Sequence, residues 1–497
     1  MAKLNLSLFY AFLLGTLAVL GFAPFYTFPA AIISVAGICY YWFKATSPAA
    51  AFKLGFQFGL GLYIAGIYWI YIALNTFGGM PWWFAGFCTF CLCAFMALFV
   101  GLVGWASKKL GSPLISIAVL WGLSDWIRSW IFTGFPWLTV GYSQAPHSPL
   151  AGYMPLVGVY GVSVIAVFVA ALIASWFANP PQNLAWKRNA IAAFVLIIVT
   201  GNVLKIIDWT TPIGAPINVA LVQGNISQSE KWSPEKTQST IDQYLSMVIG
   251  SKAELIILPE TALPVLSSQL DPSVKDLLKA HAMQNKGDII VGLVEYNEGS
   301  NNTVGEYFNS AISFGNNPTQ AYSKNHLVPF GEFIPLKQVF GWIYRDWLNM
   351  PLSDLSRGGT HQTPMNLVNQ KIAVNICYED VFGEEIIRQL PKATLLVNIS
   401  NDAWYGKSYA ANQHMQFSQV RALETGRMML RATNTGATAA IDPHGYVIAH
   451  APHDVQTTLN VSAQGYSGST PYVRWGNWPF IVFCFAVIAF VIRRKAN

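Results

Sequence analysis

The chain has 497 residues, of which 53% are hydrophobic and 11% are charged, whereas about 25% of the residues of an average soluble protein are charged. This composition argues against an ordinary soluble enzyme. It also excludes a disordered chain, because so apolar a sequence buries enough surface to offset the entropy lost on ordering. The formal net charge of +6 would by itself be compatible with a polyanionic partner such as nucleic acid.

The charged residues are distributed very unevenly along the sequence. Residues 1–209 contain eleven of them, residues 210–476 contain forty and residues 477–497 contain three. The two flanking regions carry a net charge of +10 and the middle region −4, so the basic excess gives no reason to expect nucleic acid. We predict a membrane domain over 1–209, an exported polar domain over 210–476, and a last membrane helix with a basic tail over 477–497.

Eight apolar stretches have nearly the length of about 20 residues that a membrane-spanning helix needs. They lie at residues 6–23, 28–43, 52–74, 82–105, 114–134, 155–177, 189–207 and 477–492. Basic residues gather in the loops at one end of these predicted spans, at Lys3, Lys44, Lys53, Lys108, Lys109, Lys187, Arg188, Arg493, Arg494 and Lys495. The short loops at the opposite end contain no Lys or Arg. This pattern predicts cytoplasmic termini and places residues 210–476 in the periplasm, outside a bacterial inner membrane.

Two charged residues, Asp125 and Arg128, lie within a predicted span, three positions apart and therefore on one helix face. Charges inside a span often have a function, but mutual pairing explains these two. With no internal repeat and no chain of proton-carrying residues, they do not indicate a transporter.

Five of the six cysteines lie in apolar stretches. Cys88, Cys91 and Cys93 have a spacing that resembles a metal site, but in so apolar a helix we interpret them as small buried side chains. No other His or Cys spacing indicates a metal, and no glycine-rich loop indicates a nucleotide. We therefore expect neither a metal nor a cofactor. Cys377, in the exported region, has no disulfide partner there, so it is either sealed in a core or used chemically.

The exported region alternates strand-like and helix-like segments, which is typical of an α/β domain. Strands are expected at 217–225, 254–258, 288–296, 308–314, 320–323, 371–377, 394–400, 433–441, 446–450 and 457–461. Helices are expected at 233–248, 272–286, 380–390 and 412–431. On the last of these helices we predict a salt-bridged face, formed by Arg421, Glu424, Arg427 and Arg431.

Three reactive side chains stand where predicted strands end: Glu260, Lys324 and Cys377. Sites in α/β folds gather at the carboxyl ends of strands, and a carboxylate, an ammonium and a thiol together can perform acyl transfer. Glu260 would be the general base, Cys377 the nucleophile, and Lys324, with the N–H of Tyr378, would stabilise the oxyanion. Taken singly, each has an ordinary alternative: a carboxylate at a strand end, a surface lysine and a core thiol.

Four motifs make the pattern specific. Three segments resemble the Glu, Lys and Cys motifs of the nitrilase superfamily. They are Leu-Pro-Glu-Thr-Ala (258–262), Tyr-Ser-Lys-Asn-His-Leu-Val-Pro-Phe-Gly-Glu-Phe-Ile-Pro (322–335) and Asn-Ile-Cys-Tyr-Glu-Asp (375–380). Asn-Ile-Ser-Asn-Asp-Ala-Trp-Tyr-Gly (398–406) is similar to the segment that follows them, with Tyr405 where Phe is common. With seven predicted spans before and one after, the whole chain resembles the bacterial apolipoprotein N-acyltransferase family.

The resemblance implies an activity and its residues. The enzyme would move a fatty acyl chain from a membrane phospholipid to Cys377 as a thioester, and then to the α-amino group of the diacylglyceryl-modified N-terminal cysteine of an apolipoprotein. Glu260, Lys324 and Cys377 would form the triad of a four-layer α-β-β-α nitrilase sandwich. Glu332 and Glu379 would support the triad. Trp232, in Glu-Lys-Trp-Ser (230–233), matches another motif of the family, and Asn309 and Tyr378 match it less specifically. We expect the protein to work as a monomer.

Residues 327–350 are too aromatic for an ordinary exposed loop. We hypothesise a membrane-facing arm that guides acyl chains, in which Phe333, Trp342 and Trp347 contact lipid. The alternative is a helix packed on the domain core. Nearby His326 is interpreted as structural.

Two other functions remain open from the sequence. A membrane-tethered amidase of the nitrilase type would use the same triad but resolve the thioester with water. A lipid-binding scaffold without activity would need no triad, and the intact Glu, Lys and Cys set argues against it.

Overall fold

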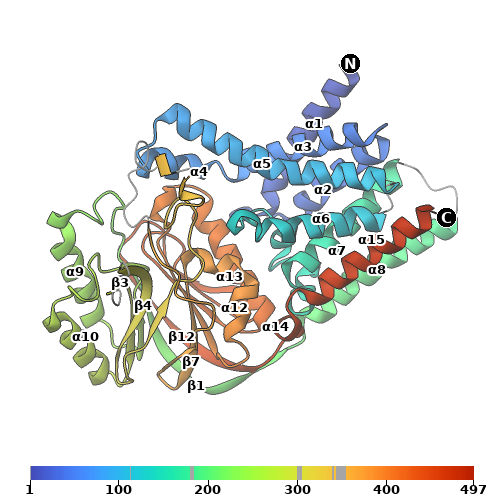
Figure 1. Ribbon diagram of the computed structural model, residues 1–497. Helices are drawn as coiled ribbons and strands as arrows, with labels where there is room; N and C mark the ends of the chain where they lie inside the picture. Colours follow the sequence, from blue (N-terminus) through green and yellow to red (C-terminus); the bar gives the residue numbers. More distant parts are fainter. Residues whose placement is uncertain are drawn as a thin grey trace. The chain divides into compact units, whose positions relative to one another are not determined.

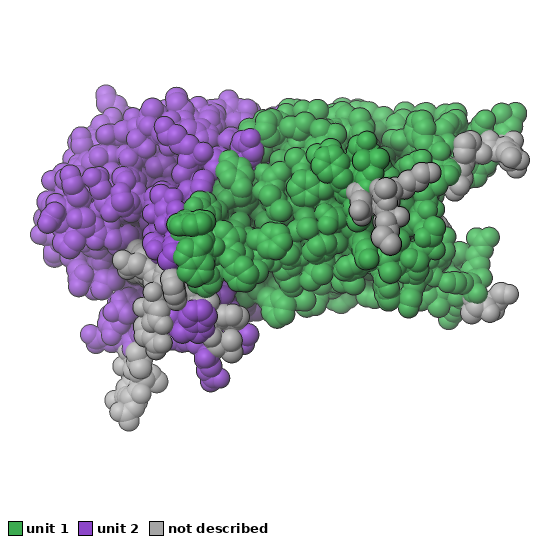
Figure 2. Space-filling view, turned by 90° about the horizontal axis from the view of Figure 1, so that it is seen from above, with its two compact units in different colours: residues 1–71, 82–208, 474–497 green, residues 72–81, 209–473 purple. Residues whose placement is uncertain are grey.

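The computed structural model describes residues 2–111, 114–178, 184–298, 305–338, 341–342 and 354–496. The chain divides into two compact units, shown in separate colours in Figure 2. The first comprises Met1–Tyr71, Trp82–Asp208 and Arg474–Asn497, and the second comprises Ile72–Pro81 and Trp209–Val473. The division near residues 208 and 473 follows the change in charge density. The grouping of Ile72–Pro81 with the second unit is not indicated by its composition.

The first unit is helical (Figure 1). Its main helices are α1 (Ala2–Ala18), α2 (Phe28–Lys44), α3 (Pro48–Gly66), α4 (Trp69–Ile72), α5 (Trp82–Lys109), α6 (Leu114–Arg128), α7 (Met154–Ala178), α8 (Leu184–Lys205) and α15 (Trp478–Ala496). Each of the eight predicted apolar stretches contains one of these helices. The stretch 52–74 is not one continuous helix, because α3 ends at Gly66 and the chain bends by 50° before it continues from Trp69.

Some of these helices are long and apolar enough to cross a membrane. Among the described residues, three helical segments have the length and apolar composition of a membrane-spanning helix: Trp82–Lys109, Pro149–Ala178 and Leu184–Lys205. The bent pair Pro48–Gly66 and Trp69–Phe77 would be a fourth if it forms one span, and Leu6–Gly21 and Phe28–Lys44 are apolar but shorter.

Close packing and one buried ion pair hold the first unit together. At Gly55 and Gly59 of α3, an added Cβ would lie 2.6 Å from the Val100 oxygen and 2.7 Å from the Ala97 Cα of α5, so only glycine lets these helices approach so closely. The predicted pairing of Asp125 with Arg128 is confirmed, with 2.6 Å between Oδ1 and Nη2. Arg128 also donates to the carbonyl of Trp137, which ties the loop after α6 to this pair.

The second unit contains two six-stranded sheets, with the orders β12-β1-β2-β3-β4-β5 and β11-β10-β9-β8-β7-β6. The strands of the first are β1 (Thr210–Gln223), β2 (Leu255–Ile257), β3 (Asp288–Asn297), β4 (Glu306–Gly315), β5 (Ala321–Ser323) and β12 (Thr457–Gly468). Those of the second are β6 (Met365–Leu367), β7 (Gln370–Ile376), β8 (Leu395–Ser400), β9 (Met429–Thr433), β10 (Ala439–Ile441) and β11 (Val447–His450). The helices α9 (Pro234–Ile249) and α10 (Pro272–Gln284) lie on one side, and α12 (Gly383–Ile386) and α13 (Ala410–Thr425) on the other (Figure 1).

The strands bury both faces, which explains their almost uninterrupted apolar sequences. In β2, Leu255 and Ile257 belong to an apolar cluster that contains residues of both sheets, whereas Ile256 packs in a second cluster with α9 and α10. In β8, Val397 belongs to the cluster shared by the two sheets, and Leu396 packs with α13. This alternation follows from the period of two along a strand: neighbouring side chains of β2 and β8 pack in different apolar clusters.

Three predicted elements of this unit are wrong. The predicted helix 412–431 ends at Thr425, where Gly426 adopts the left-handed conformation with φ 63°, and the chain then forms β9. The predicted strand 433–441 is therefore the end of β9 and a separate β10. The predicted salt bridging is confirmed for Arg421 and Glu424 of α13, with 3.0 Å between Nη1 and Oε2. Arg427 and Arg431 lie beyond the helix, and all four side chains are buried. The predicted helix 380–390 is a series of short turns around α12.

Candidate active site

Glu260, Lys324 and Cys377 each follow the carboxyl end of a strand, as predicted. Glu260 comes three residues after β2, and Lys324 and Cys377 directly follow β5 and β7. The main chain of Lys324 is bonded to Asn309 of β4, with 2.8 Å between N and O. All three are buried, so the surface-lysine alternative does not describe Lys324.

The ammonium of Lys324 lies between two carboxylates. Its Nζ is 3.3 Å from Glu260 Oε1 and 2.9 Å from the Glu332 carboxylate, and the residue is only 1% exposed. Burial alone would lower the pKa of Lys324, but the attraction of Glu260 and Glu332 outweighs it and raises the pKa well above its usual value. Lys324 is therefore a fixed positive charge in the site.

The carboxylate of Glu260 is held by hydrogen bonds at both oxygens. Asn309 Nδ2 donates to Oε1 over 2.8 Å and also to Glu332 over 2.9 Å. The main-chain N–H of Asn401, directly after β8, donates to Oε2 over 2.9 Å. Such donors fix the orientation of a carboxylate and favour its charged form. Asn309 therefore positions two acidic groups of this site.

Cys377 has an unusual backbone conformation. Its φ is +52°, which costs a non-glycine residue about 1–2 kcal/mol, and strain of this kind is often found at functional sites. Burial raises the pKa of the thiol, the negative charge of Glu260 raises it further, and Lys324 lowers it. The thiol is consequently protonated at neutral pH, and a nucleophilic role would require a base beside it.

Glu379 joins the segments that carry Lys324 and Cys377. Its Oε1 accepts hydrogen bonds from the N–H groups of Asn325 and His326, at 2.7 and 3.1 Å, and its Oε2 accepts from the N–H of Ile376 at 2.8 Å. The hydroxyl of Tyr322 also donates to this carboxylate. Burial raises the pKa of Glu379 to about 7, although these donors oppose the shift. One buried carboxyl thus fixes the ends of β5 and β7 relative to each other.

A buried ionic network behind Cys377 was not predicted. His414 of α13 lies 2.8 Å from Asp402 and 2.9 Å from Asp380, and its Nε2 is 3.1 Å from the carbonyl oxygen of Cys377. Arg431 of β9 contacts the same two carboxylates at 2.8 and 3.2 Å. Burial and Arg431 lower the pKa of His414, but Asp380 and Asp402 outweigh them and raise it to about 9. The motifs 375–380 and 398–406 contain Asp380 and Asp402, but neither motif indicated that the two residues share one ionic network.

The other predicted site residues differ in how far they are buried. Tyr378 is buried, and Trp232 and Phe333 are half-buried. The Phe333 ring lies 5.6 Å from the guanidinium of Arg357. Trp342 is 45% exposed, and Trp347 lies outside the described residues, as does much of the predicted arm. His326 stacks on Phe382, with ring centroids 3.6 Å apart, which is consistent with a structural role.

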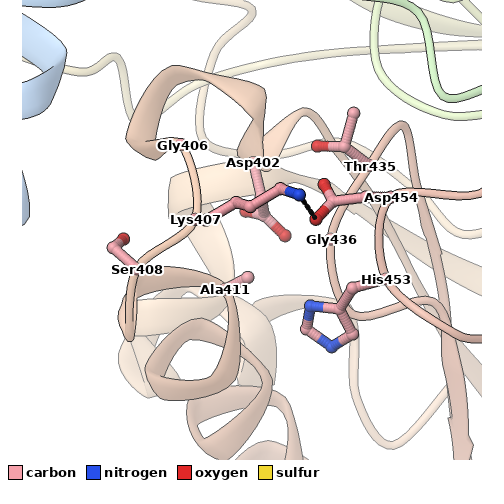
Figure 3. Close-up of a pocket in the computed structure, with 9 residues that line it drawn as sticks. All are labelled: Asp402, Gly406, Lys407, Ser408, Ala411, Thr435, Gly436, His453 and Asp454. Carbon is pink, nitrogen blue, oxygen red and sulfur yellow. Dashed lines mark ion pairs between the residues drawn. The ribbon is translucent and has the colours of Figure 1, made fainter.

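A polar pocket lies near the network but not at the triad. Figure 3 shows Lys407 extending toward Asp454, with 3.9 Å between Nζ and Oδ2. The pocket is lined by Asp402, Gly406, Lys407, Ser408, Ala411, Thr435, Gly436, His453 and Asp454. It contains none of the three reactive side chains. Among the described residues, no group of three or more His, Cys, Asp and Glu could hold a metal ion.

Comparisons with known proteins identify the family of the chain. The family model for the apolipoprotein N-acyltransferase N-terminal domain matches residues 14–172, and the carbon-nitrogen hydrolase model matches residues 218–472. An apolipoprotein N-acyltransferase of Nitrosomonas europaea is 48% identical over 472 residues, which cover 94% of this chain and 93% of the relative. This chain belongs to the apolipoprotein N-acyltransferase family. The family predicted from the motifs is thus confirmed.

A second member of the apolipoprotein N-acyltransferase family, from Chromobacterium violaceum, is 40% identical over 96% of this chain and 92% of its own length. A solved carbon-nitrogen hydrolase from Helicobacter pylori G27 has 17% sequence identity and a TM-score of 0.37, with 54% of this chain and 94% of that chain covered. The named relatives and the family model, and not the solved structure, show that the chain is an N-acyltransferase with a carbon-nitrogen hydrolase domain.

Proposed function

We propose that this enzyme transfers a fatty acyl chain from a membrane phospholipid to the α-amino group of the N-terminal diacylglyceryl-cysteine of apolipoproteins, through a thioester on Cys377. The observation that carries the proposal is the buried contact of Glu260 with Lys324 beside a strained cysteine, in a chain that is 48% identical to an apolipoprotein N-acyltransferase.

In the first half-reaction, the Glu260 carboxylate takes the proton of the Cys377 thiol, and the sulfur attacks the ester carbonyl carbon of the phospholipid. The carbonyl oxygen becomes a tetrahedral oxyanion. Lys324 and the main-chain N–H of Tyr378 stabilise this charge. When the carbon–oxygen bond to glycerol breaks, the leaving alkoxide receives the proton from Glu260 and departs as a lysophospholipid. A thioester remains on Cys377.

In the second half-reaction, the neutral α-amine of the apolipoprotein attacks the thioester carbonyl, and Glu260 accepts a proton from the nitrogen. The carbon–sulfur bond breaks as the amide forms, and the proton on Glu260 returns to the sulfur. The same base serves both steps, which fits a carboxylate fixed by Asn309 and Asn401 rather than a mobile one. Glu332 and Glu379 hold Lys324 and the chain around Cys377 in place.

The proposed setting of the reaction is a bacterial inner membrane. Each of the eight apolar helices would span it, with cytoplasmic termini, and residues 210–476 would form a periplasmic domain with the α-β-β-α nitrilase arrangement. The positive charge of the apolar regions supports this orientation. Both substrates are anchored in lipid, so a catalytic domain attached to the outer leaflet brings the thiol to them. Trp232, Phe333, Trp342 and Trp347 are proposed to contact substrate, and the protein is proposed to act as a monomer.

The test is mass spectrometry of the purified enzyme after incubation with a phospholipid whose acyl chains are isotopically labelled. We expect the label on the Cys377 peptide as a thioester, and its transfer to a diacylglyceryl lipopeptide added afterwards. The Cys377→Ala variant should acquire no label. Release of free fatty acid alone, or of ammonia from an amide substrate, would instead indicate a hydrolase, which membership of this family does not favour.

A further inference from the structure

A second lysine, Lys231, lies at the active site although no motif drew attention to it. It is 3% exposed, and its Nζ donates a hydrogen bond to the main-chain oxygen of Glu260 over 3.1 Å. Lys231 also interacts electrostatically with Cys377. Its ammonium is therefore bonded to the main chain of the residue that carries the general base, and its charge acts on Cys377.

Lys231 lies in the loop between β1 and α9, and hydrogen bonds to other segments hold this loop in place. The main-chain N–H of Asn225 donates to the carbonyl of Asn434 over 2.8 Å, and Asn434 Nδ2 donates to the carbonyl of Ile226 over 2.7 Å. Farther along, Gln228 Oε1 accepts from Asn401 Nδ2 over 2.7 Å. Asn401 is the residue whose N–H holds Glu260. The loop is thus bonded to the segment that orients the general base.

Folding alone does not account for this buried ammonium. Among the described residues, one of its three N–H donors has an oxygen acceptor, the Glu260 carbonyl, and its Nζ lies 6.0 Å from the centroid of the Trp232 ring. A buried charge with so few partners costs folding free energy, and an apolar side chain of similar volume is often more stable in its place. Burial accordingly lowers the pKa of Lys231 to about 8, even though Glu260 and Cys377 act in the opposite direction.

We propose that Lys231 is a positioning residue of the acyl transfer, which anchors the Glu260 main chain and supplies a second positive charge beside Glu260 and Cys377. This inference rests on the proposed function. The added charge opposes the raising of the Cys377 thiol pKa by burial. The charged and titratable groups around Glu260 and Cys377 are Lys324, Asp402, Tyr378 and Tyr405, and all of them stay in place in the test.

The test replaces Lys231 in the full-length enzyme and follows the rate of acylation of Cys377 against pH. In Lys231→Met, we expect the acid limb of the profile to move up by about one pH unit and the rate at neutral pH to fall about tenfold, the effect of losing one nearby charge. Lys231→Arg, which keeps the charge, should restore most of the acid limb. The matched control is Lys236→Met, on the exposed face at the start of α9, which should behave as the wild type.

Two further measurements separate a catalytic effect from a structural one. Thermal unfolding of Lys231→Met should occur at the wild-type temperature or above it, because a poorly paired buried charge has been removed. The rate of alkylation of Cys377 by iodoacetamide, read on its own peptide, should show the same shift with pH without any lipid. Lys231→Gln provides a second neutral variant if Lys231→Met does not fold.

Unchanged pH profiles in a folded neutral variant would overturn the inference, and so would a lower unfolding temperature without a shift of either profile. If the wild type forms no acyl thioester, the proposed function fails by itself. The alkylation profiles would then still decide the role of Lys231.

Discussion

His414 lies directly behind Cys377, with its Nε2 3.1 Å from the carbonyl oxygen of the cysteine. Asp402 and Asp380 hold the ring on both sides, at 2.8 and 2.9 Å, so that it is positively charged at neutral pH. A charged donor on this carbonyl holds the peptide group between Cys377 and Tyr378. No histidine belongs to the predicted triad, and His414 acts on the main chain of the nucleophile rather than on its sulfur.

His414 should make the stability of the enzyme decrease in alkaline solution. Its pKa is raised from 6.5 to about 9 in the folded protein, so the folded state holds a proton that the unfolded state has lost. The stabilisation is complete below pH 6.5 and is lost as the pH rises through 9, with a total on the order of 3 kcal/mol. Thermal unfolding of the solubilised enzyme between pH 6 and 10 measures it.

The matched pair for that measurement is His414→Gln and His444→Gln. The first should have a lower unfolding temperature at pH 6 and a flatter dependence on pH from 6.5 to 9. The second changes a histidine in the turn between β10 and β11 and should keep the wild-type dependence. Equal slopes in all three proteins would show that His414 carries no extra proton.

Glu379→Gln should reduce the rate of acylation about 100-fold, a loss that a displacement of about 1 Å can cause. A glutamine offers only one acceptor oxygen, so the N–H groups of Ile376 and Asn325 cannot both keep their bonds. The loop of Lys324 and the turn of Cys377 would then lose their common anchor. Acylation measured by mass spectrometry provides the rate, and the exposed Glu384→Gln is the control. A fully active Glu379→Gln enzyme would contradict the anchoring role.

The three reactive residues could be predicted from the sequence because each follows an apolar run that ends at a recognisable position. The buried network could not. On α13, polar side chains such as Gln413, Gln416 and Gln419 are buried, so hydrophobic periodicity reveals neither which face is inside nor where the helix ends. Arg431 was assigned to that helix for this reason. Its partner Asp380 is 51 residues away in the sequence, and only the pairing of β7, β8 and β9 brings the two together.

Arg431→Met should destabilise the second unit by about 3–5 kcal/mol, because it leaves Asp380 and Asp402 buried without their guanidinium partner. The control is Arg388→Met. Arg388 lies 3.8 Å from Glu385 and is partly exposed, so its loss should cost about 1 kcal/mol or less. Denaturant unfolding followed by tryptophan fluorescence compares the two. Similar losses in both variants would mean that the buried network contributes no more than a surface pair.

The aromatic residues near the active site should affect the use of lipid rather than the chemistry. Trp342 is 45% exposed, which favours contact with lipid over packing in the domain core. Replacement of Trp342 and Trp347 by Ser should raise the apparent KM for phospholipid severalfold, with kcat and the unfolding temperature unchanged. Tyr446→Ser, at an exposed aromatic residue in the turn before β11, is the control and should leave KM as it is. If these tryptophans instead pack on the core, the unfolding temperature falls and KM stays constant, so the two measurements separate a lipid-contacting arm from a packed helix.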